Sequence, residues 1–310
     1  MATGSYASAT RGFTDVVRES LYQVKSHVWS VRNARGMARS FIEIMRADEE
    51  RGAEVFGRPI TGVDLLEIGT GTMATQALYY ACRGNRVTGI DLEPQEAGWS
   101  VGELVDLARH NGPRRALKTL ARKVIGLDRV FPREVAQQMG RSAPPPMSLL
   151  RMDAGRMTFP DASFDVVHSY DVLEHVEDVE AVVREIARVL RPGGLAMIVL
   201  MPYTCENGSH DYRLISGHRG DLAYWAHLRP QHRAAVKPGA FVNALGLREV
   251  QRICERFMPG AIFGAPPAKD PEMPARLREL RAAGELEGYD DEELLAVRLR
   301  VLWKKPAPPA

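Results

Sequence analysis

The sequence predicts an α/β fold, a Rossmann-like, doubly wound and mostly parallel sheet of about seven strands. Short apolar segments recur along the chain with helical patterns between them, which is typical of parallel sheets built from strand–helix–strand units. The first apolar segment ends in a glycine turn, Gly69-Thr70-Gly71, that leads into a helical pattern. The second ends at Asp91, about twenty residues further on. A strand, a glycine turn, a helix and a second strand form one such unit.

Length, charge and cysteine content exclude several classes of protein. The 310 residues suffice for one large α/β domain with insertions. The 41 Lys and Arg nearly balance the 39 Asp and Glu, for a net charge of +2, so nucleic acid is not an expected partner. Three widely spaced cysteines predict neither a disulfide framework nor a cysteine metal site, and suit a reducing compartment.

No apolar run approaches the ~20 residues that a membrane span requires. The N-terminal residues lack the apolar core of a secretory signal. We therefore expect a cytoplasmic protein that has no membrane partner.

The chain is expected to divide into an N-terminal helical segment, residues 1–58, and an α/β domain, residues 59–310. The α/β domain carries a largely helical insertion at 94–147, closed by a proline-rich connector. Insertions of this length in a compact domain are usually functional. We expect both helical additions to cap the site, although they could also form a homodimer interface.

The regular part of the pattern predicts most of the sheet. Strands are expected at 63–68, 86–91, 148–153, 164–169 and 195–201, with helices at 73–83 and 178–190. The C-terminal third is less regular. Helices are expected there at 219–236, 238–245 and 275–283, and strands at 247–253 and 297–303.

The glycine turn predicts a binding site for a nucleoside-bearing cofactor. Two bare residues let a ligand approach the main chain closely, and the following helix start offers free N–H groups and a partial positive charge. Asp91 ends the neighbouring strand, where a carboxylate can accept both hydroxyls of a ribose. The run from Gly69 to Ala74 also satisfies G-x-G-x-x-A, so at this point a nicotinamide dinucleotide remains open.

Further segments between residues 63 and 202 distinguish a nicotinamide dinucleotide from another nucleoside-bearing cofactor. They read LLEIGTGT, VTGIDLEP, RMDAGRMTFPDASFDVVHS, VLEHVED and VLRPGGLAMIVL. Together they resemble the class I S-adenosylmethionine-dependent methyltransferases, in the broad group that includes ubiquinone and menaquinone methyltransferases and many natural-product methyltransferases. The resemblance implies the strand order 3-2-1-4-5-7-6 with the last strand antiparallel. It also implies S-adenosylmethionine as cofactor, S-adenosylhomocysteine as product, and no metal.

The resemblance assigns roles around the cofactor. It places Glu67, Gly69, Thr70 and Gly71 around the methionine part, Asp91 on the ribose hydroxyls, Leu92 beside the adenine, Asp153 and Ala154 at the adenine edge, and Ser169 and Tyr170 facing the sulfonium. Met73 stands where the family usually has a third glycine, and we expect its side chain to narrow the pocket beside the methionine moiety.

Methyl transfer from a sulfonium is an in-line displacement in which the protein mainly aligns the reacting atoms. An oxygen nucleophile also has to lose a proton, and histidine is the side chain most often used for that. His175 follows the fourth expected strand and His210 the fifth, so both are candidate catalytic bases. Candidate acceptor-binding residues outside the core of the sheet are Tyr22, Trp29, Tyr203, Tyr212 and Arg213.

We therefore expect methylation of a small or medium organic acceptor, on an oxygen atom, in natural-product or secondary metabolism. The alternatives are an N- or C-methyltransferase of the same fold, an NAD(P)-dependent oxidoreductase that uses the G-x-G-x-x-A loop, and a non-catalytic partner protein that binds S-adenosylmethionine. A nucleic-acid methyltransferase is disfavoured, because the tetrapeptide typical of that class is missing after the fourth strand.

Overall fold

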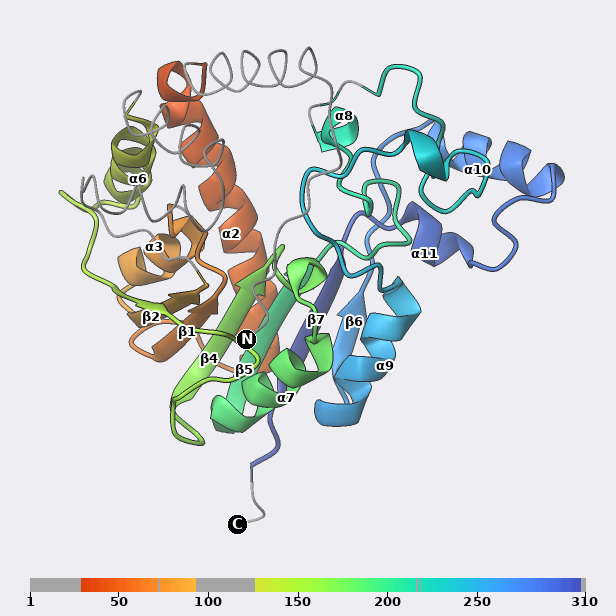
Figure 1. Ribbon diagram of the computed structural model, residues 1–310. Coiled ribbons are helices and arrows are strands. Elements are labelled where there is room, and N and C mark those ends of the chain that lie inside the picture. The colour runs from red at the N-terminus through yellow and green to blue at the C-terminus, as the bar shows by residue number, and fades with distance from the viewer. Residues whose placement is uncertain (1–28, 72, 93–125, 216, 218, 308–310) are drawn as a thin grey trace. The chain divides into compact units, whose positions relative to one another are not determined.

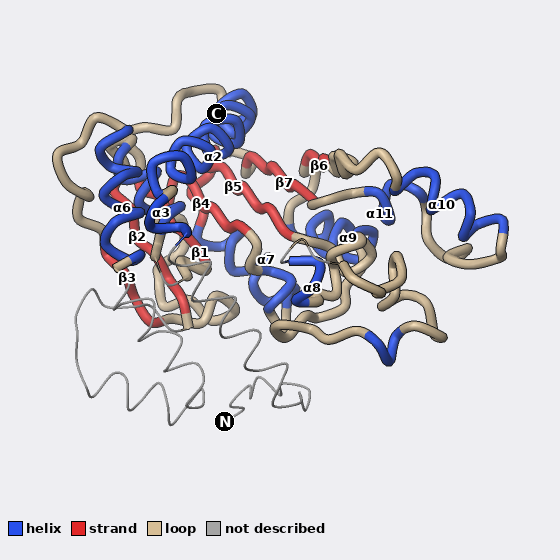
Figure 2. The backbone as a smooth tube through the Cα atoms, turned by 90° about the horizontal axis from the view of Figure 1, so that it is seen from above, coloured by secondary structure: helices blue, strands red, loops and turns tan. Residues whose placement is uncertain are grey.

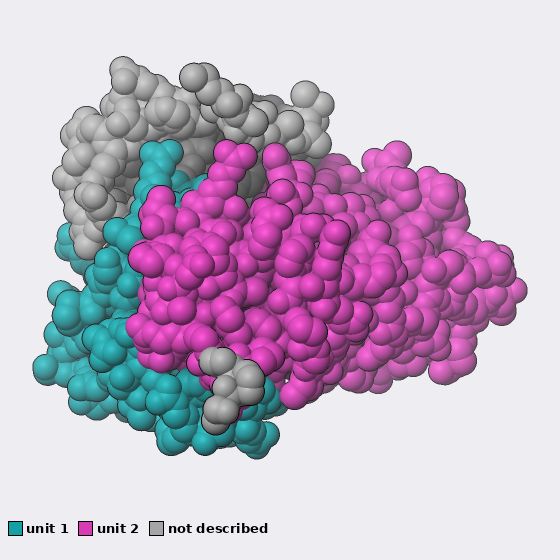
Figure 3. All heavy atoms as spheres, turned by 90° about the horizontal axis from the view of Figure 1, so that it is seen from below, with its two compact units in different colours: residues 1–153 teal, residues 154–310 magenta. Residues whose placement is uncertain are grey.

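The structure is a computed structural model that describes residues 29–71, 73–92, 126–215, 217 and 219–307 (Figure 1). The chain divides into two compact units, Met1–Asp153 and Ala154–Ala310, shown in different colours in Figure 3. Much of the predicted N-terminal segment and of the predicted insertion lies outside the described residues.

The strands form one seven-stranded sheet in the order β3-β2-β1-β4-β5-β7-β6. Their bounds are β1 Asp64–Ile68, β2 Arg86–Asp91, β3 Ser148–Arg151, β4 Phe164–Tyr170, β5 Leu190–Leu200, β6 Ile262–Gly264 and β7 Leu299–Lys304. Strand β7 runs antiparallel to both β5 and β6, and the other described strand pairs are parallel. The predicted fold class, strand order and antiparallel last strand are confirmed.

In the first unit, three parallel strands pair in the order β3-β2-β1. The middle of β1 is fully buried, as expected of a strand covered on both faces. Helices α2 (Ala34–Phe56), α3 (Thr75–Cys82) and α6 (Leu127–Gln138) pack against one another beside these strands (Figure 1). Helix α2 ends at Gly57, whose left-handed backbone lets its N–H donate to Ala53.

A buried carboxylate joins α2 to α3. Glu49 accepts a hydrogen bond of 2.5 Å from the Tyr79 hydroxyl and one of 3.0 Å from Arg83 Nε. Burial raises the pKa of the Tyr79 hydroxyl, and the bond to Glu49 raises it further. Tyr79 is therefore a neutral donor at physiological pH, and it fixes the helix that follows the glycine turn.

The second unit is built on β4, β5, β7 and β6. Helices α7 (Val179–Val189) and α9 (Leu247–Phe257) lie side by side over one face of these strands (Figure 1). Asp178 caps the start of α7 by accepting a 2.9 Å hydrogen bond from the Ala181 N–H. The helix predicted at 178–190 and the strand predicted at 195–201 are confirmed, although β5 begins before the Pro-Gly-Gly segment.

Three predictions for the C-terminal third are wrong. Residues 247–253, predicted as a strand, belong to α9, whose residues Leu247, Val250 and Cys254 recur at helical spacing and are buried. The sixth strand is β6 instead. Residues 219–236 and 238–245, predicted as helices, are mostly loops and turns (Figure 2), and a short 3-10 helix, η2 (Arg233–Ala235), is the one helical segment within them.

The segment between β5 and α9 is nevertheless well packed. It contains α8 (Tyr212–Ile215), and its fully buried Trp225 lies in a core with side chains of α10 (Met273–Ala282) and α11 (Asp291–Leu295). The Trp225 indole N–H donates to Leu294 O at 3.2 Å, and its backbone N–H donates to buried Glu206 at 2.6 Å. Contacts distant in sequence, rather than a helical period, therefore shape this segment.

Within the described residues, none of the helices combines the length and the apolar character needed to cross a membrane.

Candidate functional site

The glycine turn after β1 has the backbone that its sequence predicts. Gly69 and Gly71 have φ angles of +75° and +59°, in the left-handed region that favours glycine. The N–H groups of Gly69 and Thr70 both donate to Ile90 O, at 2.8 and 3.3 Å. The turn is thereby folded back onto the end of β2, and α3 begins shortly after it.

Asp91 lies beside this turn, as predicted. Its Oδ2 accepts a 2.8 Å hydrogen bond from the Gly71 N–H. The carboxylate is partly exposed, so it can serve a ligand at the turn while it holds the loop in place. This is the arrangement in which a nucleoside ligand is held between a glycine turn and the acidic end of the next strand.

Two residues at the junction of β1 and this turn are deeply buried. Glu67 is 1% exposed and Thr70 is 4% exposed. The Thr70 hydroxyl makes no hydrogen bond within the described part of the chain, so it is available to a bound ligand. Thr70 packs closely on Gly89 of β2, where a Cβ would lie 2.4 Å from Thr70 Cγ2. Gly89 therefore makes room for the loop.

Of the predicted adenine-side residues, two are exposed on the first unit and the third is the first residue of the second unit. Leu92 is 62% exposed, and Asp153, two residues past β3, is also exposed. Met152 N–H donates to Asp91 O at 3.0 Å, which brings the end of β3 beside the ribose-side carboxylate. Ala154 is the first residue of the second unit and is partly buried.

At the end of β4, Ser169 is completely buried and its hydroxyl has no hydrogen-bond partner among the described residues. The Tyr170 ring lies under the guanidinium of Arg298, 5.4 Å from Cζ. Arg298 also binds both carboxylate oxygens of Asp171 at 2.8 Å. This two-bond ion pair between Arg298 and Asp171 fixes the chain directly after β4.

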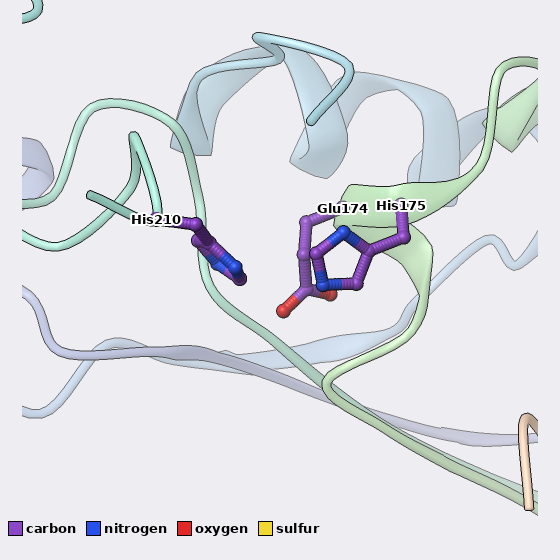
Figure 4. Close-up of side chains that lie close together, drawn as sticks. All are labelled: Glu174, His175 and His210. Carbon is purple, nitrogen blue, oxygen red and sulfur yellow. The ribbon is translucent and has the colours of Figure 1, made fainter. Parts of the chain in front are cut away.

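The two histidines predicted as bases lie together. Figure 4 shows His210 facing His175 and Glu174, which share the short turn η1 (Leu173–His175). The two imidazole rings are 4.7 Å apart at nearly right angles. The three side chains each offer a ligand atom within 4.8 Å of the others. We call Glu174, His175 and His210 the two-histidine cluster.

Glu174 was not predicted as a site residue. Its Oε1 accepts a 3.3 Å hydrogen bond from the Met201 N–H, whereas Oε2 is buried with no partner among the described residues. The available signal was its position directly before His175 in a Leu-Glu-His segment at the end of a predicted strand. The spacing alone does not reveal that the carboxylate turns inward.

Burial changes the protonation of this cluster. Desolvation, together with the charge of Asp171, raises the pKa of Glu174 to about 8. Desolvation and the nearby His175 lower the pKa of His210 to about 4. With nothing bound at neutral pH, Glu174 is therefore largely protonated and His210 is neutral.

The predicted acceptor residues are dispersed. Tyr22 lies outside the described residues, and Trp29 is 58% exposed in the first unit. Tyr203 packs against His227 with ring centroids 4.9 Å apart, at the edge of the Trp225 core. Tyr212 is partly exposed at the start of α8.

Arg213 is engaged within the protein. Its guanidinium binds both carboxylate oxygens of Asp211, at 3.0 and 2.8 Å. Asp211 also accepts a 2.7 Å hydrogen bond from the Lys237 N–H. These bonds fix the turn that carries His210, which gives Arg213 a positioning role beside any contact with an acceptor.

Comparisons with known proteins agree with this geometry. A family model described as a methyltransferase domain matches residues 110–198. A probable S-adenosylmethionine-dependent methyltransferase of Mycolicibacterium smegmatis is 28% identical over 240 residues, 73% of this chain and 85% of the relative. A probable enzyme of the same description from Mycobacterium tuberculosis is 37% identical over 103 residues, 33% of each chain. The chain thus spans about a third of that second relative.

A further relative is named 27-O-demethylrifamycin SV methyltransferase, from Amycolatopsis mediterranei. It is 40% identical over 86 residues, 25% of this chain and 32% of the relative. Among solved structures, a methyltransferase from Methanosarcina mazei aligns with a TM-score of 0.42 at 15% identity, covering 80% of this chain and 94% of its own.

The sheet order with an antiparallel last strand, the glycine turn held by the carboxylate of the next strand, and the methyltransferase relatives agree with one another. In these features the chain is similar to the class I S-adenosylmethionine-dependent methyltransferases.

Proposed function

We propose that the chain transfers the methyl group of S-adenosylmethionine to an oxygen atom of a small or medium organic acceptor in natural-product metabolism. The observation that carries the choice of oxygen is the two-histidine cluster, Glu174, His175 and His210. The methyl donor already carries a good leaving group, so proton removal is the main chemical help that a hydroxyl acceptor requires. A neutral amine needs no such group before it attacks.

The cofactor would be held at the glycine turn and by two side chains beside it. Gly69 and Gly71 leave room for close approach, and the buried Thr70 hydroxyl is available to the methionine end. Asp91 would accept the ribose hydroxyls. The charge balance of the chain supports a small-molecule acceptor rather than a nucleic acid.

In the reaction, the acceptor hydroxyl gives up its proton as its oxygen attacks the methyl carbon. The new O–C bond forms as the C–S⁺ bond breaks, and neutral S-adenosylhomocysteine leaves. His175 Nδ1 lies 2.6 Å from Phe241 O, so this nitrogen carries the proton and donates, and Nε2 keeps a lone pair. Nε2 is then the ring atom that can act on the acceptor.

The names of the relatives support methyl transfer but differ in the acceptor. They include the rifamycin enzyme, a sterol 24-C-methyltransferase of Aspergillus fumigatus and a phosphatidylethanolamine N-methyltransferase of Cereibacter sphaeroides. The rifamycin enzyme, whose name specifies an oxygen of a natural product, supports the reading from the cluster.

The test is methyl transfer from S-adenosylmethionine labelled in its methyl group to a panel of phenols, alcohols and amines. We expect label on oxygen, and a loss of at least ~10²-fold in kcat for His175→Ala and His210→Ala, with S-adenosylhomocysteine affinity unchanged. His232→Ala, which changes a histidine outside the cluster, should retain the wild-type rate. Label on amines alone, with both cluster variants fully active, would exclude the proposed acceptor atom.

A further inference from the structure

The two-histidine cluster has the composition of a metal site, although the family resemblance of the sequence implies no metal. Two imidazoles and one carboxylate place their potential ligand atoms within 4.8 Å of one another (Figure 4). Ligands of one ion at the usual ~2.0–2.2 Å lie at most about 4.4 Å apart. Small side-chain rotations would therefore suffice to close the three atoms around a cation.

Two of these atoms are buried without a partner. Glu174 Oε2 and His210 Nε2 make no hydrogen bond within the described part of the chain, and their residues are only 3% and 8% exposed. A buried polar atom without a partner costs free energy, and each such atom in a native structure calls for an explanation. A cation bound between them would satisfy both atoms at once.

The remaining atoms of the cluster are oriented by the main chain. The hydrogen bond from His175 Nδ1 to Phe241 O, 2.6 Å long, leaves Nε2 as the ligand atom. The 3.3 Å bond from Met201 N–H to Glu174 Oε1 leaves Oε2. Metal-binding histidines almost always donate their second ring N–H to an oxygen in this way, and metal-binding carboxylates are themselves hydrogen-bonded.

The backbone around the cluster is shaped to present these groups. His210 has a φ of +49°, in the left-handed region where residues other than glycine are uncommon and carry strain. The adjacent Asp211 makes hydrogen bonds to the Arg213 and Lys237 N–H groups, at 2.9 and 2.7 Å. These bonds hold the strained turn, so the imidazole stays aimed at η1.

We propose that Glu174, His175 and His210 form a three-ligand site for a divalent first-row transition-metal ion. A mixed set of imidazole and carboxylate ligands suits Zn²⁺, Fe²⁺ or Mn²⁺, whereas Mg²⁺ and Ca²⁺ prefer oxygen ligands alone. The nearby Asp171 is bound through both carboxylate oxygens to Arg298, so it lends negative charge rather than a fourth ligand. Three protein ligands leave coordination positions open, as in catalytic sites.

The open positions give the ion a role, and this part rests on the proposed function. An acceptor hydroxyl that binds the ion ionises at a lower pH than it does in water, as metal-bound water does. Because both imidazoles then hold the ion, the proton leaves to solvent instead of to His175, and the resulting oxyanion attacks the methyl carbon as the C–S⁺ bond breaks. The ion is neither oxidised nor reduced in this step.

The decisive experiment is calorimetric titration of tag-free full-length protein, stripped with a chelator, with Zn²⁺, Mn²⁺ and Mg²⁺ separately. We expect one Zn²⁺ or Mn²⁺ per chain and much weaker Mg²⁺ binding. His175→Ala, His210→Ala and the isosteric Glu174→Gln should each weaken Zn²⁺ binding by ~10²-fold or more. This loss exceeds the one usually caused by replacing residues that only hydrogen-bond to the metal ligands. Matched controls are Glu177→Gln, an exposed carboxylate three residues away, and His232→Ala; both should bind like wild type.

A second measurement separates the loss of a metal ligand from misfolding of the variant. Co²⁺ loaded into the stripped protein should give visible absorption bands that shift in Glu174→Gln, a variant that keeps the size of the side chain. Wild-type protein that binds Zn²⁺ and Mn²⁺ no better than the three variants would overturn the metal site. S-adenosylhomocysteine is titrated in parallel: metal binding without any adenosyl ligand binding would instead overturn the proposed function alone.

Discussion

Thr70 and Gly89 show how single residues shape the cofactor loop. Thr70 follows a glycine with positive φ and turns its methyl group onto β2, where Gly89 has no side chain. The glycine turn and Asp91 could be predicted from sequence, because turn conformation and strand ends are local properties. The need for Gly89 could not be predicted, because it arises from the contact of the loop residue Thr70 with a neighbouring strand.

We predict that Gly89→Ala weakens both the fold and cofactor binding. The new Cβ would lie 2.4 Å from Thr70 Cγ2 and 2.7 Å from Leu149 Cδ2, and overpacking of this kind typically costs about 1–3 kcal/mol. Thermal denaturation should show the loss of stability, and titration with S-adenosylhomocysteine should show weaker binding because Thr70 is displaced.

The matched control is Gly36→Ala in α2, where a Cβ meets nothing within 4 Å. Alanine is favoured over glycine inside a helix by roughly 1 kcal/mol, so this variant should be as stable as wild type or slightly more stable. A Gly89→Ala protein with wild-type melting temperature and wild-type affinity would show that the loop does not rest on β2 as described.

At the scale of elements, local patterns predict α7, α10 and every described strand except β6, whereas long-range contacts determine the irregular segments between them. The start of α9 reads as a strand in the sequence, because a seven-residue window is too short to separate the helical period from the strand period. The turns around Trp225 are fixed by contacts with α10 and α11, which no local spacing encodes. For the same reason the sequence does not reveal Glu174 as a site residue, since His210 comes close to it only through a strained turn.

Arg188 and Glu185 in the C-terminal half of α7 both bind the loop before β4, and the ion pair between them predicts a pH effect. Arg188 binds Glu185 at 2.8 Å and also donates to Met157 O at 3.0 Å. The Arg188 hydrogen bond is the main reason that the pKa of Glu185 is lowered. A lowered folded-state pKa gives stability that is present above the unfolded pKa and is lost as pH falls through the folded one.

We therefore predict that Glu185→Gln lowers stability at pH 7, by about 1–2 kcal/mol for a lost charged hydrogen bond. The difference from wild type should begin to shrink as pH falls below the unfolded-state pKa of about 4.3, and it should vanish once the folded carboxyl is also protonated. Thermal melts at pH 7 and at pH 3.5 measure both differences. A destabilisation that is equal at the two pH values would mean that the charge of Glu185 contributes nothing.

At the scale of the whole molecule, the alternation of strands and helices predicts the parallel sheet, and the resemblance to the methyltransferases implies the strand order and the position of the cofactor site. The acceptor could not be predicted to the same depth, because its candidate residues come from irregular segments and from residues outside the described part. The central claim for the molecule is that its glycine turn serves an adenosyl cofactor with Asp91 as the ribose ligand.

The measurement that tests this claim most directly is calorimetric titration of the full chain with S-adenosylmethionine, S-adenosylhomocysteine and NAD. We predict binding of the two adenosyl ligands alone, with affinity lowered ~10–100-fold by Asp91→Ala, as expected for loss of a charged hydrogen bond. Asp64→Ala, which removes a carboxylate paired with Arg86 at the other end of the same strands, should bind as wild type. Binding of NAD without either adenosyl ligand would contradict the assignment of the cofactor.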